Sequence, residues 1–124
     1  MSPEANSGSI AINVFNSISP MPGGISGLLV TLVDNNRFFV EQYTGDSIGS
    51  VIAERYQSPI TNLTTANVIK LMAVQDFGVQ SVSVGDLSTN NSNLMVMAKE
   101  FETRGMEELK SLDIGTIKYF KARG

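Results

Sequence analysis

The sequence contains no cysteine, no histidine and no tryptophan. Without cysteine, the chain has no disulfide, no thiolate nucleophile and no cysteine-bound metal. Without histidine, it lacks the commonest general base and the commonest protein ligand of transition metals. These absences disfavour most hydrolase, transferase and metalloenzyme mechanisms, and an enzyme would have to work with carboxylates alone.

Charged residues are also scarce: they make up 17% of the 124 residues, whereas hydrophobic residues make up 42%. An average soluble domain has about 25% charged residues. A surface with so few charges is tolerable where partner subunits cover part of it, so the composition points towards assembly. The length fits one compact domain, residues 1–124.

The charges are unevenly distributed along the chain. The net charge is −3, but residues 1–113 carry −6 and the last eleven residues carry +3, from Lys118, Lys121 and Arg123. A basic end of this kind is either a solvated terminus or a segment that docks on an acidic partner or faces nucleic acid. There is no apolar run of 18 residues, and residues 1–4 lack the basic region of a secretory signal. We therefore expect no membrane partner and no export.

The first 24 residues are rich in Gly, Pro and Ser and predict an N-terminal arm. Within it, Ile10, Ile12 and Val14 alternate with other residues, which indicates a short extended segment. Such an arm is weakly ordered unless it lies on a neighbour. Ile10, Ile12 and Val14 are therefore candidate interface residues.

Residues 25–113 predict a helical body, so the fold class is mainly α: a small bundle of about four helices. Apolar residues recur at steps of three and four from Ile25 to Tyr43, and Gly45 suits a left-handed C-terminal cap. The β-branched cluster at residues 28–33 also fits a strand. The spacing favours the helix.

Two more helices are predicted in the middle of the chain. A short one covers residues 48–56, with its charged residues outward. Ser58 and Pro59 then suit the start of a second helix, as its N-cap and first helical residue. This helix is apolar nearly all round and ends at Gly78, and such a helix usually lies at the centre of a bundle.

The C-terminal third predicts a β-like segment, a charged helix and a tail. Small polar and apolar residues alternate from Ser81 to Ser88, which suits a strand or hairpin, and a polar loop follows. The last helix starts after Ser92 or Asn93, and its Gly105 allows a close helix crossing or a kink. Residues 114–124 predict an extended tail. The candidate interface residues from the hairpin and the tail are Val82, Val84, Asp86, Leu87, Ile114, Ile117, Lys118, Tyr119, Phe120, Lys121 and Arg123.

No catalytic, cofactor-binding or metal-binding motif is recognisable. Asp86 follows a glycine in an uncharged stretch, but one carboxylate among Asn and Ser residues lacks the ligand spacing of a calcium loop. The glycines of residues 22–27 lack the Lys and Ser/Thr of a phosphate-binding loop. We predict a protein that is not an enzyme and holds no cofactor.

The order of these features resembles the head–tail connector (adaptor) proteins of tailed bacteriophages. The resemblance covers about residues 25–113. It is carried by a helix ending in Val40-Glu41-Gln42-Tyr43-Thr44-Gly45, a short helix with Glu54-Arg55-Tyr56, the Ser58-Pro59 start, the stretch Ser83-Val84-Gly85-Asp86-Leu87-Ser88 and a charged last helix. The Gly-rich residues 1–24 depart from the family pattern.

The resemblance implies a small virion subunit that forms a ring, commonly dodecameric, under the portal protein of the capsid. Such a ring extends the DNA channel without recognising DNA sequence, and it presents a platform to the next neck or tail protein. The protein would lie in the neck of the virion, and in the host cytoplasm during assembly. In the family, the segments matching Val82–Ser92 and Ile114–Phe120 tend to make ring or portal contacts.

Two other functions stay open from the sequence. One is a different neck or tail structural protein, such as a head-completion or tail-terminator subunit, whose folds are usually richer in strand. The other is a small regulatory or nucleic-acid-binding protein that works through its basic end.

Overall fold

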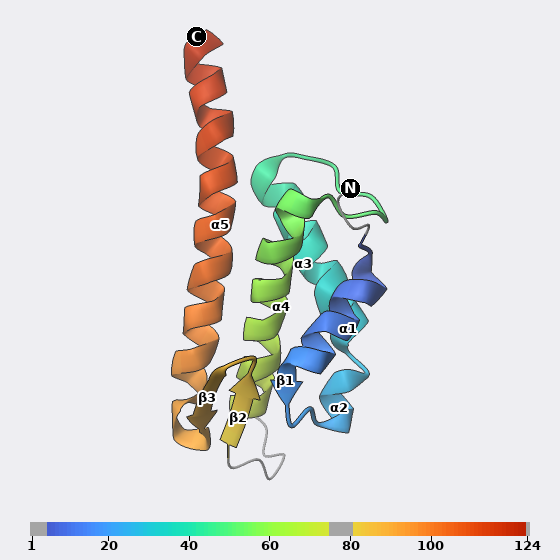
Figure 1. The fold of residues 1–124 in the computed structure, drawn as a ribbon. Helices are drawn as coiled ribbons and strands as arrows, with labels where there is room; N and C mark the ends of the chain where they lie inside the picture. Colours follow the sequence, from blue (N-terminus) through green and yellow to red (C-terminus); the bar gives the residue numbers. More distant parts are fainter. Residues whose placement is uncertain (1–4, 75–80, 124) are drawn as a thin grey trace.

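Helices account for most of the chain in the computed structural model, which describes residues 5–74 and 81–123 (Figure 1). Side chains are described through Leu112, apart from Asn91. The elements in chain order are α1 (Ser7–Ser17), β1 (Ile18–Ser19), α2 (Gly23–Ser26), α3 (Leu29–Thr44), α4 (Glu54–Val74), β2 (Ser81–Val84), β3 (Leu87–Asn90), a 3-10 turn (Asn91–Asn93) and α5 (Leu94–Arg123). The fold is thus a small, mainly α bundle with a three-stranded antiparallel sheet, and the predicted class is confirmed.

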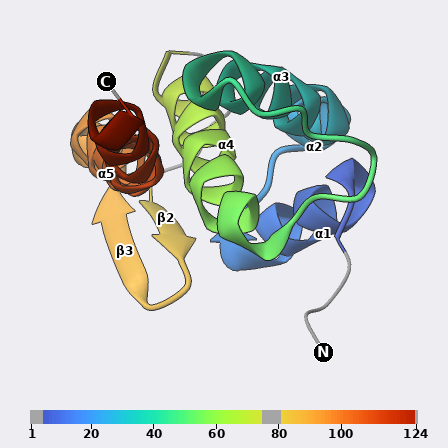
Figure 2. The same ribbon diagram turned by 90° about the horizontal axis from the view of Figure 1, so that it is seen from above.

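The centre of the bundle is α4, as its nearly all-round apolar sequence predicts. Figure 2 shows α5 on one side of α4, with α1 and α3 on the other. Even Thr64 and Thr65 are buried on this helix. The helix begins at Glu54, before the predicted start, and Pro59 lies inside it. The predicted end at Gly78 lies outside the described residues.

The prediction of an extended N-terminal arm is wrong, because residues 7–17 form the helix α1. Asn6 and Ser9 make a capping box: the Asn6 side chain accepts from the Ser9 N–H at 2.8 Å, and the Asn6 N–H donates to Ser9 Oγ at 2.8 Å. Ile10 and Val14, one helical turn apart, are 1% and 0% exposed in the core. Their spacing fits strand alternation and a buried helical stripe equally well.

The helical interpretation of residues 28–33 is correct from Leu29 onward, although the single predicted helix is in fact two. The short α2 ends at Gly27, and α3 begins after Leu28. At its other end, α3 terminates as predicted: Gly45 has φ of 77° and donates its N–H to the Glu41 carbonyl.

Residues 45–53 form a loop, so the predicted helix over residues 48–56 is wrong for residues 48–53. Side chains of the flanking helices satisfy the loop backbone in place of helical hydrogen bonds. Glu41 Oε1 accepts from the Ile48 N–H at 2.9 Å, and Arg37 Nη1 donates to the Ile48 carbonyl at 3.1 Å. The hydroxyl of Tyr56 donates to Asp46 Oδ2. The apolar side chains of Ile48 and Ile52 still reach the core.

The predicted hairpin is confirmed, and it is part of a larger sheet. The strand order is β1-β2-β3, with Val84 opposite Leu87 and Ile18 opposite Val84. Gly85 has φ of 57°, the positive φ that a primed two-residue turn requires at its first central position. The strand β3 reaches Asn90, into the residues predicted as a loop.

The long helix α5 packs along α4 and then extends beyond it (Figure 1). Gly105 makes the close crossing that the sequence predicted: a Cβ there would lie 2.9 Å from Leu63 Cγ and 3.3 Å from the Pro59 carbonyl oxygen. The predicted extended tail over residues 114–124 is wrong, because α5 continues to Arg123. No proline interrupts this stretch, and adding residues to an existing helix is far easier than starting one.

Candidate interaction surfaces

The predicted interface residues fall into three groups. Ile10, Val14, Val82 and Val84 lie in the core of the chain itself, so they are not free to contact a partner in this structure. Ile12, Asp86 and Leu87 are exposed. The third group, whose backbone belongs to α5 but whose side chains are outside the description, consists of Ile114, Ile117, Lys118, Tyr119, Phe120, Lys121 and Arg123.

The turn of the hairpin forms one wall of a groove of about 460 Å³, here called the hairpin groove. The rest of the groove comes from Ser17 at the end of α1, polar residues of α4, and Phe101 and Arg104 of α5. The Gly85 N–H donates to the Ser17 carbonyl at 2.9 Å, which ties the turn to α1. This contact leaves Asp86 and Leu87 at the surface beside the groove.

The lining surface of the hairpin groove is mainly apolar, from residues such as Val84, Leu87 and Phe101, with one charge of each sign. Thr61 and Asn62 provide hydroxyl and amide groups from α4, and Arg104 stacks over Phe101 with its guanidinium carbon 5.1 Å from the ring centroid. Asp86 has no ion-pair partner among the described side chains. The Asn62 amide is already engaged, since its Nδ2 donates to Glu108 Oε1 at 2.5 Å.

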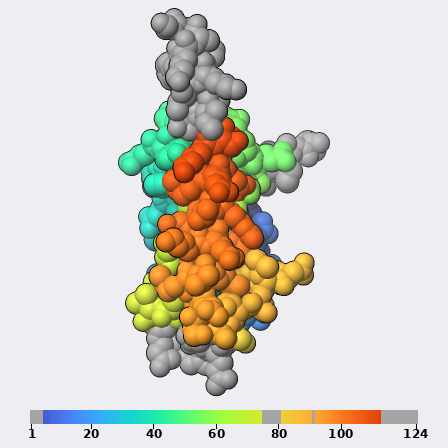
Figure 3. All heavy atoms as spheres, turned by 90° about the vertical axis from the view of Figure 1, so that its left-hand side faces the viewer, coloured from blue at the N-terminus to red at the C-terminus, as the bar shows by residue number. Residues whose placement is uncertain are grey.

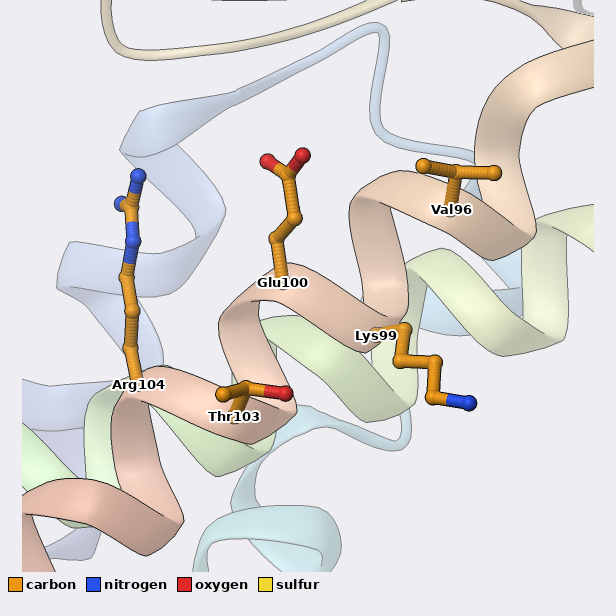
Figure 4. Close-up of a pocket in the computed structure, with 5 residues that line it drawn as sticks. All are labelled: Val96, Lys99, Glu100, Thr103 and Arg104. Atoms are coloured by element: carbon orange, nitrogen blue, oxygen red, sulfur yellow. The ribbon is translucent and has the colours of Figure 1, made fainter.

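The outward face of α5 is a second surface, because no described element lies over it (Figure 3). Figure 4 shows Val96, Glu100 and Arg104, spaced one turn apart, projecting from α5, with Lys99 and Thr103 beside them. These five residues line a shallow depression of about 460 Å³. The lining surface is mainly apolar, from Val96 and the aliphatic stems of the longer side chains, with charges of both signs at its edge.

A smaller pocket of about 170 Å³ lies where α3, α4 and α5 meet, and we call it the amide pocket. Asn36 Nδ2 donates to Thr64 Oγ1 at 3.0 Å and to Asn67 Oδ1 at 2.9 Å. These two bonds use both hydrogens of Asn36 and fix the orientation of the two amides. Asn36 Oδ1 and Asn67 Nδ2 have no hydrogen-bond partner among the described residues, so the pocket offers one acceptor and one donor. Phe39 and Met106 add apolar lining.

The sequence interpretation did not find the amide pocket or the outward face of α5. The amide pocket combines residues from three helices that are far apart in the chain, so only the packing brings them together. The exposed Val96 gave a weak signal, since it breaks the polar face of a charged helix.

Tyr56 lies at the start of α4, where its side chain is buried. Burial raises the pKa of Tyr56, and the hydrogen bond to Asp46 raises it further. The pair joins the 45–53 loop to α4, a structural role. Among the described residues, no group of three or more Asp and Glu side chains could hold a metal ion, and no helix is long and apolar enough to cross a bilayer.

Comparison of the chain with models of known protein families, with curated proteins and with solved structures found no match.

Proposed function

We propose that this protein is a structural subunit of a phage neck, a head–tail connector that assembles into a ring between the portal and the next neck or tail protein. One observation carries the proposal: large hydrophobic side chains are exposed on several separate surfaces of a small domain. They include Ile12 and Phe15 on α1, Val30 on α3, Leu87 on β3 and Val96 on α5. On α1, Ile12 and Phe15 are adjacent at positions i and i+3, and neighbouring exposed apolar groups of this kind fit a surface that another subunit covers.

The element order gives the connector proposal further support. The segments that carry the family resemblance lie on α3, α4, the hairpin and α5, in the expected order. The turn with Asp86 and Leu87 is exposed, as a ring or portal contact requires. The mainly helical fold also favours a connector over tail-terminator subunits, whose folds are usually richer in strand. The loop at residues 45–53 and the folded N-terminal region depart from the family pattern.

Genomic context and a binding assay test this function. A reading frame next to portal and capsid genes supports it. The purified chain is then mixed with that portal protein and examined by native mass spectrometry. We expect a complex with a fixed number of copies per portal ring. A chain that stays monomeric at high concentration and never binds the portal would refute the proposal.

A further inference from the structure

We propose that α1 of one copy packs across the amide pocket of the next copy, with Phe15 as its anchor. The inference rests on the proposed function, because it assigns the two surfaces through which neighbouring copies of a ring would meet. It identifies the occupant of the pocket as a second copy of this chain.

The first surface is unusual in its charge. From residue 5 to residue 33 the sequence has no Asp, Glu, Lys or Arg, and this stretch includes all of α1 and α2. On α1, Ile12 is 61% exposed and Phe15 is 47% exposed. Asn16 lies beside them and is also exposed. Ile12, Phe15 and Asn16 stand at positions i, i+3 and i+4, the spacing with which a helix places anchors into a groove.

The second surface is the amide pocket, which suits an uncharged partner such as α1. The carboxylate on the rim of the amide pocket, Glu102, is already paired with Lys70. An uncharged helix can therefore cover the pocket without burying an unpaired ion. A partner helix with a charged side chain at this position would bury that charge without a counter-ion.

The two surfaces also match in shape and hydrogen bonding. A volume of about 170 Å³ suits one large side chain and is too small for a helix. The Phe15 ring would contact Phe39 and Met106, and aromatic anchors in such pockets commonly dominate binding energy. The Oδ1 of Asn16 can accept from Asn67 Nδ2, and the Nδ2 of Asn16 can donate to Asn36 Oδ1; these two pocket atoms have no partner among the described residues.

The positions of the two surfaces favour a ring. Figure 2 shows α5 on one side of α4, with α1 and α3 on the other, and the amide pocket lies where α3, α4 and α5 meet. The exposed face of α1 and the amide pocket are therefore two different surfaces of the chain. A contact between two different surfaces is heterologous, and repeating it gives a ring where the rotation between copies closes and a helical filament where it does not. A self-complementary contact of α1 with α1 would instead stop at a dimer.

Cysteine cross-linking can test this contact, because the chain has no natural cysteine. Asn16→Cys is combined with Met106→Cys in the full chain, and a short bismaleimide is added to the protein alone and with portal protein. The matched control combines Asn16→Cys with Glu100→Cys, which lies on the outward face of α5 (Figure 4). Each single variant is treated in the same way.

We expect a ladder of cross-linked oligomers from the Asn16/Met106 pair alone. An assembled or portal-bound protein without that ladder would overturn the α1 contact and leave the connector function standing. Dimers from Asn16→Cys alone would also overturn it, because they indicate a two-fold contact. A chain that neither self-associates nor binds portal would overturn both proposals.

A second measurement does not need cross-linking. Phe15→Ala should weaken self-association, measured by sedimentation, by about tenfold or more. The control Val74→Ala, at the exposed C-terminal end of α4, should leave it unchanged. Thermal unfolding of both variants separates lost contact from lost folding. Equal weakening by both variants, or none by Phe15→Ala, would contradict the role of Phe15 as anchor.

Discussion

Replacing Gly105 by Ala should destabilise the protein, although alanine is the better helix former. On an exposed helix this change stabilises by about 1 kcal/mol. Here the new Cβ would lie 2.9 Å from Leu63 Cγ and 3.0 Å from Leu63 Cδ2. Leu63 is buried against its own neighbours, and overpacking of this kind costs about 1–3 kcal/mol. We therefore expect a net loss of up to about 2 kcal/mol.

A double-mutant cycle separates the two effects. Leu63→Ala alone should cost about 2–5 kcal/mol, because it leaves a cavity. In that background Gly105→Ala should cost less than in the wild type, since the clashing side chain is gone and only the Pro59 carbonyl oxygen, 3.3 Å away, remains close. Thr103→Ala on the outward face of α5 is the control for helix propensity. Urea unfolding followed by circular dichroism gives each free energy. A stabilising Gly105→Ala in the wild-type background would refute the close crossing of α4 and α5.

Three further predictions address other parts of the fold. Ile10→Ala should cost about 2–5 kcal/mol of unfolding free energy, whereas the exposed Ile12→Ala on the same helix should change it little; equal effects in denaturant unfolding would contradict the burial of one side of α1. Gly85→Ala should destabilise the protein by about 1–3 kcal/mol because the φ of Gly85 is positive, whereas Gly49→Ala should not. Thermal unfolding measures both variants. Equal shifts in melting temperature would argue against the positive-φ turn of the hairpin. Tyr56 has a raised pKa in the folded state, so its contribution to the free energy of unfolding is complete below about pH 10 and is lost as the pH rises further. Urea unfolding at several pH values measures this loss of stability. The loss should be smaller in Tyr56→Phe and absent below about pH 9.

The sequence predicted the parts of the fold that have strong local signals. The apolar residues of α4 indicated a central helix, Gly45 indicated the end of α3, and the alternation around Val84 indicated the hairpin. Each of these signals lies within a few residues of the feature it specifies. Local preference and tertiary packing agree at these positions, so the prediction holds.

The N-terminal region shows where sequence patterns are ambiguous. A short apolar run with i, i+2 and i+4 members contains both a strand pattern and a helical turn. For Ile10 and Val14 the outcome depends on the capping box of Asn6 and on burial against α3 and α4, which are distant in the chain. The loop at residues 45–53 was misjudged for a similar reason, because its hydrogen bonds come from side chains of α3 and α4.

Of the candidate site, the sequence identified the exposed turn at Asp86 and Leu87 but not the surfaces assembled from several helices. The amide pocket requires Asn36, Asn67 and Met106 to converge. None of these residues is distinctive alone, because polar residues on helices are usually solvated. Only the packing of α3 and α5 against α4 gives them a shared position.

The loop at residues 45–53 has a consequence for the energetics of association. Arg37 donates to the Ile48 carbonyl, Glu41 accepts from the Ile48 N–H, and the Ile52 N–H donates to the Ala5 carbonyl at 2.7 Å. The Tyr56 hydroxyl donates to the Asp46 side chain. The loop therefore presents Val51, 62% exposed, from a backbone whose conformation is already fixed. A partner that covers Val51 gains the hydrophobic contact with little further loss of conformational entropy, so folding has already met most of the cost of ordering this surface.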